Sequence, residues 1–278
     1  MNKFKEKFMN AVFLTAAFAS VLAVCLICIF LFVNGIPAIM EIGFGEFIFG
    51  TEWSPVDIPP LFGIFPMIIG SILITVIAVL LGVPIGVLCA IFLSHVCTDK
   101  LYKVIKPCVE LLAGIPSVVY GFFGMVIIVP LLNSSIMTAG IVLAIMVLPT
   151  VIGISESSLR AVPKQYYEGA LALGADHYGS VFNVVVPAAK SGILASIVLG
   201  IGRAIGETMA VMMVAGNQPR IPTSLFVGVR TLTANIGIEM GYAQGLHRSA
   251  LNATGVILFI FILIINLIFV KVKRGDIK

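Results

Sequence analysis

The sequence has little charge, few histidines and no set of cysteines that suits disulfide pairing. Only 11% of its 278 residues are charged, where soluble domains carry about 25%, and 60% are hydrophobic. So few charges cannot cover the surface of a soluble protein of this length, which excludes a water-soluble enzyme. A net charge of +4 with no basic stripe excludes nucleic-acid binding. The class that remains is a polytopic membrane protein.

Two further absences limit the chemistry. The cysteines are odd in number and the histidines lie far apart, so they indicate neither a disulfide framework nor a metal site: Cys25, Cys28, Cys89, Cys97, Cys108, His95, His177 and His247. The sequence has no Gly-x-x-x-x-Gly-Lys-Ser/Thr motif and no Gly-Lys pair, so it does not hold a nucleotide by that route. We therefore expect no catalytic residue, metal or cofactor in this chain. Any ATP must be used by a separate ATPase.

Six apolar segments are long enough to cross a bilayer. They predict an all-α integral membrane protein with one transmembrane domain over 1–278 and spans at about 11–33, 63–94, 111–132, 137–155, 192–216 and 250–270. As a straight helix the second would reach roughly 48 Å at about 1.5 Å per residue, more than the hydrocarbon core of about 30 Å. We expect it to tilt, to bend at Gly82-Val83-Pro84, or to begin as an interfacial helix. Pro116 and Pro149 are expected to kink spans three and four.

Lysine and arginine gather on one side of these spans. Thirteen of the seventeen lie at the termini or in the connections after spans two and four: Lys3, Lys5, Lys7, Lys100, Lys103, Lys106, Arg160, Lys164, Lys190, Lys271, Lys273, Arg274 and Lys278. The opposite side holds Arg220, Arg230 and Arg248, and Arg203 lies inside span five. By the positive-inside rule both termini are cytoplasmic. The first apolar run is longer than a usual signal-peptide core, so we expect it to remain as a span.

The cytoplasmic connection over 156–191 is expected to contain two short helices. Residues 165–173 favour helix, Gly174 is a break, and Asp176 is placed to cap a second helix that ends near Pro187. A unit of this kind beside a membrane could bind lipid, read DNA or dock onto a protein. Few cations flank it and two carboxylates lie within it, which argues against lipid and DNA. Its chemistry favours docking onto a soluble partner.

The same stretch resembles the loop that marks permease subunits of ATP-binding-cassette importers. That loop starts with Glu-Ala-Ala, has a glycine six positions after the glutamate and, after nine more residues, Ile-x-Leu-Pro. The matching residues here are Glu168, Gly169, Ala170, Gly174, Val184, Val186 and Pro187. Gly169 replaces the first alanine, and valines replace the isoleucine and leucine with apolar packing preserved. The resemblance implies the type I importer permease fold, with these residues in coupling helices that seat in a cleft of the ATPase subunit.

Span five carries two ionisable residues at membrane depth, Arg203 and Glu207. On insertion scales each costs about 2.5–3.5 kcal/mol if it is unpaired. The two stand four residues apart, so on a continuous helix they share one face and are expected to pair. Two interpretations are open: a pair that only neutralises itself between packed helices, and a pair that lines a transport pathway.

The stretch around this pair, residues 200–217, is very similar to the membrane subunits of phosphate-specific importers, in particular the C-type member of a two-permease pair. Three other stretches match that subunit: Phe49-Gly-Thr-Glu-Trp-Ser-Pro55, Glu110–Gly121 and Thr231–Asn235. The resemblance implies a subunit in the cytoplasmic membrane of a prokaryote that moves inorganic phosphate inward by alternating access. The implied partners are an A-type permease, two ATPase subunits that use ATP, and an extracytoplasmic phosphate-binding protein.

In such importers Arg203 and Glu207 match positions taken to matter for translocating the anion, and Thr208 adds a nearby hydroxyl. A guanidinium donates to phosphate oxygens, and a carboxylate accepts from the protonated oxygen of HPO4. The runner-up function is a permease for another oxyanion such as molybdate or sulfate. A secondary transporter is a further alternative, but it would not need the cytoplasmic helix pair and usually shows paired repeats.

Other residues are candidates for lesser roles. Glu110, Pro116 and Ser117, near the start of span three, suit gating or assembly, and Glu110 equally suits an interfacial ion pair with Lys106. Phe47, Phe49 and Trp53 in the first outer loop are expected to anchor at the membrane interface, with a docking site as the alternative. The three outer arginines are either solvated residues or groups that meet an anion or a binding protein. Residues 231–234 are expected to lie in an outer helix rather than in a seventh crossing.

Overall fold

The computed structural model describes residues 3–275, which form helices and one short β-hairpin. Lys278 and the side chains of Lys3, Lys273 and Arg274, counted among the expected cytoplasmic cations, lie outside the described residues. The first part of the chain forms α1 (Lys3–Ile42), α2 (Phe44–Phe49), β1 (Trp53–Ser54), β2 (Leu61–Phe62), α3 (Phe65–Ile91), the π-helical turn η1 (Phe92–Val96) and α4 (Asp99–Gly114). The middle forms α5 (Ser117–Phe123), η2 (Gly124–Ile128), α6 (Val129–Leu132), α7 (Ile136–Arg160), α8 (Lys164–Ala172), α9 (His177–Ser180), η3 (Val181–Val185) and α10 (Val186–Ala188). The last part forms α11 (Lys190–Gly206), α12 (Met209–Val214), α13 (Leu232–Glu239) and α14 (Gly245–Gly275).

The long apolar runs of the sequence become long helices. Among the described residues, four helices are long and apolar enough to cross a membrane, and up to six if each of two bent pairs counts as one span. The four are α1, α3 with η1, α7 and α14, which coincide with the expected first, second, fourth and sixth spans. A chain of this composition in such helices is a multi-pass membrane component.

The third expected span, 111–132, contains a break near its start. α4 ends at Gly114 and α5 begins at Ser117, and the two halves meet at 98°. Pro116 causes this break, because it has no N–H to donate and forces the residue before it out of the helical region. Ile115 accordingly has φ −71° and ψ 126°, an extended conformation. The proline produces a corner rather than the expected kink.

The fifth expected span, 192–216, is not one continuous helix. α11 starts at Lys190, where it meets the preceding helical run at 69°, and ends at Gly206. Glu207 is extended, and the chain becomes helical again at Met209 for six residues only. Glycine is unfavourable in a helix interior, and α11 carries several in its second half, so its end at Gly206 has a local cause.

Prolines in two other helices do not end them. α3 continues through Pro84, so the expected bend at Gly82-Val83-Pro84 does not break the second span, and α7 continues through Pro149. These two helices pack closely along their length. A Cβ atom at Gly82 would lie 2.8 Å from Cγ2 of Val147, so the glycine allows the close approach.

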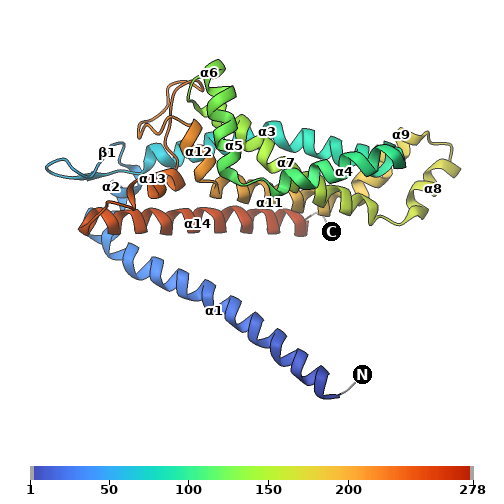
Figure 1. Cartoon of the computed structure of the whole chain (residues 1–278), viewed down its shortest axis with the longest axis horizontal. Coiled ribbons are helices and arrows are strands. Elements are labelled where there is room, and N and C mark those ends of the chain that lie inside the picture. The colour runs from blue at the N-terminus through green and yellow to red at the C-terminus, as the bar shows by residue number, and fades with distance from the viewer. Residues whose placement is uncertain (1–2, 276–278) are drawn as a thin grey trace.

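Figure 1 shows the helices running between two ends of the molecule. The end that carries β1 and β2 is called the hairpin end, and the opposite end, with α8 and α9, is called the α8 end. Helix α1 diverges from the rest and meets α14 only near the hairpin end, where the rings of Phe32 and Phe259 are 6.0 Å apart. The most apolar stretch of α1 is therefore uncovered by this chain and faces lipid or another subunit.

Candidate functional site

The residues expected at membrane depth lie at or just before the break between α11 and α12. Arg203 lies in the last turn of α11 and is exposed, while Glu207 and Thr208 form the break itself and are half-buried. Backbone groups freed at a break inside a membrane need partners, and such breaks are tolerated where they line a cavity or a subunit interface. The break therefore makes this part of the fifth expected span a candidate for lining a cavity or a subunit interface.

The expected Arg203–Glu207 pair is not formed. The i, i+4 argument required a continuous helix, and the helix ends between the two residues. Glu207 instead turns toward α12, where its Oε1 accepts a hydrogen bond from the N–H of Ala210 at 3.1 Å. This places a carboxylate at the positive end of a short helix, a favourable arrangement. Within residues 3–275 no ion pair neutralises Arg203.

The outer helix α13 covers the break from the hairpin end. The hydroxyl of Thr233 donates to the carbonyl of Glu207 at 2.9 Å, which satisfies one backbone group freed by the break. A Cβ atom at Gly237 would lie 2.9 Å from Cγ2 of Thr208, so the glycine lets α13 approach closely. α13 spans eight residues, too few to cross a membrane, so residues 232–234 lie in a short helix and not in a seventh crossing.

Glu110, Pro116 and Ser117 lie around the corner between α4 and α5. Pro116 precedes the first residue of α5, Ser117 is half-buried, and Tyr120 in the next turn donates from its hydroxyl to the carbonyl of Leu112 at 2.8 Å. The side chain of Glu110 is 65% exposed and lies 3.6 Å from Nζ of Lys106. An exposed pair at this distance stabilises little, so it supports the interfacial ion pair without making it a structural anchor.

The structure confirms the helix–break–helix expected between residues 165 and 187. α8 is followed by Gly174 at φ +90°, a conformation that glycine adopts and other residues avoid. Asp176 then caps the second helix, since its Oδ1 accepts from the N–H of Gly179 at 3.0 Å. The two helices are also joined by their side chains, because the hydroxyl of Tyr167 lies 2.7 Å from Nδ1 of His177.

Most of the expected coupling residues lie on the surface of this unit. Glu168, Gly169, Gly174 and Pro187 are exposed, Val184 and Val186 are half-buried, and Ala170 is buried. Five large apolar or aromatic side chains that the motif does not include are also exposed on it: Tyr166, Leu171, Leu173, Tyr178 and Phe182. Leu173, beside the break, is 92% exposed. Exposed apolar side chains gathered beside polar ones are typical of a surface that another molecule covers.

A cluster around Glu156 was missed by sequence reasoning. Glu156, on α7, is 2% exposed and accepts from the hydroxyl of Tyr102 at 2.8 Å, from Nζ of Lys106 at 2.6 Å and from Nε of Arg160 at 2.8 Å. The guanidinium of Arg160 also donates to the carbonyl of Leu93 at 2.9 Å. Glu156 therefore ties α7 to α4, and Arg160 connects this cluster to η1 at the end of α3. The available signal was a carboxylate inside an apolar run at i, i+4 from an arginine.

Behind α8 lies a cavity of about 410 Å³ bounded by side chains of both charges. Its lining includes Ser94, His95, Arg160, Lys164, Tyr167 and Glu168. Because Arg160 belongs to both the cavity and the Glu156 cluster, α8 and the ends of the long helices share one polar region. A displacement of α8 would therefore change the surroundings of Arg160 on α7.

A second buried carboxylate organises the hairpin end. Glu239 pairs with Nη1 of Arg230 at 2.5 Å and accepts from Nε1 of Trp53 at 2.9 Å, and its Oε2 lies 2.8 Å from Nε2 of His247. Trp53 is 6% exposed, so its expected role as an interfacial anchor was wrong: the side chain is part of the core. Arg230 is likewise engaged within the chain, which removes it from the arginines available to an outside anion.

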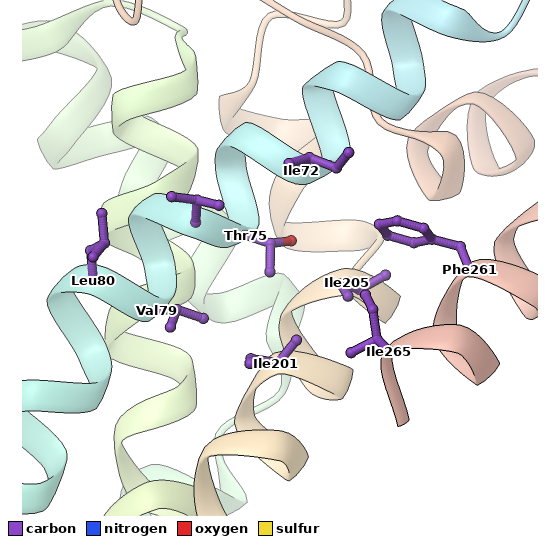
Figure 2. Close-up of a pocket in the computed structure, with 9 residues that line it drawn as sticks. Ile72, Thr75, Val79, Leu80, Ile201, Ile205, Phe261 and Ile265 are labelled. Carbon is purple, nitrogen blue, oxygen red and sulfur yellow. The ribbon is translucent and has the colours of Figure 1, made fainter. Parts of the chain in front are cut away.

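An apolar crevice of about 280 Å³ lies between α3, α11 and α14 (Figure 2). Its lining is aliphatic and aromatic except for Thr75, whose hydroxyl already donates to the carbonyl of Ser71 at 2.7 Å. Figure 2 shows Ile201 and Ile205 of α11 facing it. Arg203 lies two residues from each, roughly 200° around the helix, so its side chain leaves on the opposite face. The crevice offers nothing to an anion, and the charged face of α11 is elsewhere.

Comparison with known proteins adds sequence relatives. Residues 82–274 match the family described as binding-protein-dependent transport system inner membrane component. A probable ABC transporter permease protein, YqgH, of Bacillus subtilis is 38% identical over 256 residues, which cover 86% of this chain and 83% of that protein. The phosphate transport system permease protein PstC of Mesorhizobium japonicum is 35% identical over 267 residues, which cover 86% of this chain and 81% of that protein.

Among solved structures, the chain is similar to one in a bacterial alginate ABC transporter crystallised in complex with an alginate-bound periplasmic protein. The TM-score is 0.66, and the match covers 97% of this chain and 96% of that one. At 14% identity this likeness concerns the fold alone. The chain therefore shares its overall fold with a chain of that ABC transporter.

Proposed function

We propose that this chain, which belongs to the family of binding-protein-dependent transport system inner membrane components, is the phosphate-translocating permease subunit of an ATP-driven importer. It is an ABC importer permease subunit and contains no nucleotide-binding motif of its own. The proposed assembly adds an A-type permease, two ATPase subunits that use ATP, and an extracytoplasmic phosphate-binding protein. The permease named for phosphate transport among the relatives supports the substrate.

The observation that carries the substrate assignment is the pair of groups at the break. Arg203 is an exposed cation, and no carboxylate among the described residues forms an ion pair with it. A guanidinium donates to phosphate oxygens in a fork geometry. Glu207 keeps one carboxylate oxygen free of the α12 cap, and that oxygen suits the hydroxyl of HPO4. Sulfate and molybdate at neutral pH carry no proton to donate, so the same carboxylate repels them.

The proposed orientation places the α8 end in the cytoplasm. The cations of the sequence favour this, since the connections after the second and fourth spans lie at that end. ATP binding closes the ATPase pair, and the coupling surface of Tyr166, Leu173, Tyr178 and Phe182 moves with it. Arg160 and Glu156 connect that movement to α7 and α4. The pathway then opens toward the hairpin end and phosphate passes Arg203.

Uptake by cells tests the substrate. A strain that lacks this chain should lose ATP-dependent uptake of radiolabelled phosphate at micromolar concentration, and expression of the chain should restore it. Excess sulfate or molybdate should change the restored rate of phosphate uptake by less than about twofold, because neither oxyanion donates a hydrogen bond to Glu207. Restored uptake that either oxyanion abolishes, while unlabelled phosphate does not compete, would assign the permease to the other oxyanion.

A further inference from the structure

The turn between β1 and β2 is the most exposed apolar feature of the hairpin end. Residues 55–60 form this turn, in which the side chain of Val56 is 85% exposed and that of Ile58 is 100% exposed. Figure 1 shows the hairpin projecting beyond the end of α14, away from the helical body. Apolar side chains held in water at the tip of a projection are unfavourable, and they mark a surface that another molecule covers.

The hairpin holds this tip in one position. Trp53 pairs with Phe62 across the two strands, and their rings are 5.7 Å apart in an edge-on contact. Trp53 is fixed in turn by its hydrogen bond to Glu239. The turn itself is stiffened by its three prolines, Pro55, Pro59 and Pro60, whose rings fix φ. A tip that is already ordered loses little conformational entropy when it binds.

The charge around the tip indicates the kind of partner. Residues 34–62 carry no lysine or arginine and four exposed carboxylates, those of Glu41, Glu46, Glu52 and Asp57. Two of them, Glu52 and Asp57, flank or form part of the turn. Anionic lipid headgroups would be repelled by this segment, so the tip is not suited to insertion into a bilayer surface. A soluble protein with cationic side chains around an apolar depression is complementary to it.

We propose that the hairpin over residues 53–62 is the docking element for the extracytoplasmic substrate-binding protein. Val56 and Ile58 fill an apolar depression on that protein, and Glu52 and Asp57 meet lysine or arginine at its rim. The proposal rests on the proposed function, because it requires the hairpin end to be extracytoplasmic and a binding protein to deliver the substrate.

The same hairpin is connected to the break beside Arg203. Trp53 binds Glu239, which ends α13, and Thr233 near the start of α13 donates to the carbonyl of Glu207. One short helix therefore joins the docking element to the segment of the pathway. A displacement of the hairpin on docking is transmitted to Glu207 through these two hydrogen bonds and α13. Docking of the loaded binding protein can therefore change the position of the break.

Binding to the complete transporter in nanodiscs tests the docking surface. The probe is the purified, phosphate-loaded binding protein that supports uptake by the wild-type transporter. The double variant Val56→Ser/Ile58→Ser should raise its Kd about 10- to 100-fold, as expected when the apolar anchors of an interface are removed. The matched control Val56→Ile/Ile58→Leu keeps the tip apolar and should bind within about threefold of the wild type. Co-purification of the ATPase verifies assembly of each variant.

Two further variants separate docking from transmission. Glu52→Lys/Asp57→Lys should slow association of the binding protein about tenfold at low salt, with a smaller effect at high salt.

Trp53→Phe removes the hydrogen bond to Glu239 but keeps an aromatic ring, so it should preserve the Kd and reduce the stimulation of ATP hydrolysis by the binding protein. Normal stimulation would overturn the transmission through α13. Wild-type uptake of phosphate together with an unchanged Kd in the Val56→Ser/Ile58→Ser variant overturns docking alone, whereas absence of any binding-protein-dependent uptake by the wild type overturns both proposals.

Discussion

Replacing Arg203 by alanine should reduce the rate of phosphate uptake about 10- to 100-fold. This loss is expected when charge-assisted hydrogen bonds that contribute about 1.5–3 kcal/mol are removed. Arg203 is exposed on α11 and carries no ion pair within the described residues, so its removal leaves no carboxylate without a partner. The protein should therefore remain folded and assembled. Initial rates of labelled phosphate uptake, normalised to the amount of transporter in the membrane, measure the effect.

The variant Arg203→Lys is the matched control for charge. Lysine keeps the positive charge but not the planar fork of donors, so it should retain more uptake than alanine and less than arginine. A second control is Lys5→Ala, which removes an exposed cation of α1 and should leave uptake unchanged. Full uptake by the Arg203→Ala transporter would show that phosphate does not depend on this guanidinium.

Replacing Gly174 by proline should abolish association with the ATPase while membrane insertion is preserved. Gly174 has φ +90°, whereas proline fixes φ near −65°, so the turn between α8 and α9 cannot form as it does in the wild type. Proline also removes the hydrogen bond that the N–H of Gly174 donates to the carbonyl of Leu171 at 2.9 Å. The two helices, and with them Tyr166 and Tyr178, then no longer present one surface.

Gly169→Ala is the matched glycine control for that experiment. Gly169 lies inside α8 with negative φ and no atom within 4 Å of a Cβ built on it, so alanine fits and favours the helix by about 0.5–1 kcal/mol. Co-purification of the ATPase with the permease in detergent is the measurement. Retention of the ATPase by the Gly174→Pro variant would remove the coupling role of this unit, and loss of the ATPase from the Gly169→Ala variant would contradict the account of the turn.

Some elements could be predicted because their cause is local. Long apolar runs specify the four long helices without reference to anything else in the chain. The α8–α9 unit was equally predictable, since a glycine at the break and an aspartate at the cap act within a few residues. Its exposed aromatic surface was not, because exposure depends on how the unit packs against the ends of α3 and α7.

The sequence identified the ionisable residues of the candidate site but not their contacts. Arg203 and Glu207 were identified as the ionisable groups of their span, but their pairing assumed a continuous helix that ends at Gly206. The capping of Ala210 and the contact with Thr233 come from α12 and α13, which no sequence pattern placed against Glu207. The buried carboxylates of Glu156 and Glu239 were missed for the same reason, since most of their partners lie in other elements.

Reconstituted transport tests the central claim most directly. The chain, an A-type permease, the ATPase subunits and the binding protein are placed in proteoliposomes, and labelled phosphate delivered on the binding-protein side is followed into the lumen with ATP on the α8 side. The account predicts phosphate accumulation against its gradient that requires ATP and the binding protein, and that falls at least tenfold with Arg203→Ala. Accumulation driven by an ion gradient without ATP, or ATP-driven accumulation of sulfate or molybdate but not of phosphate, would contradict it.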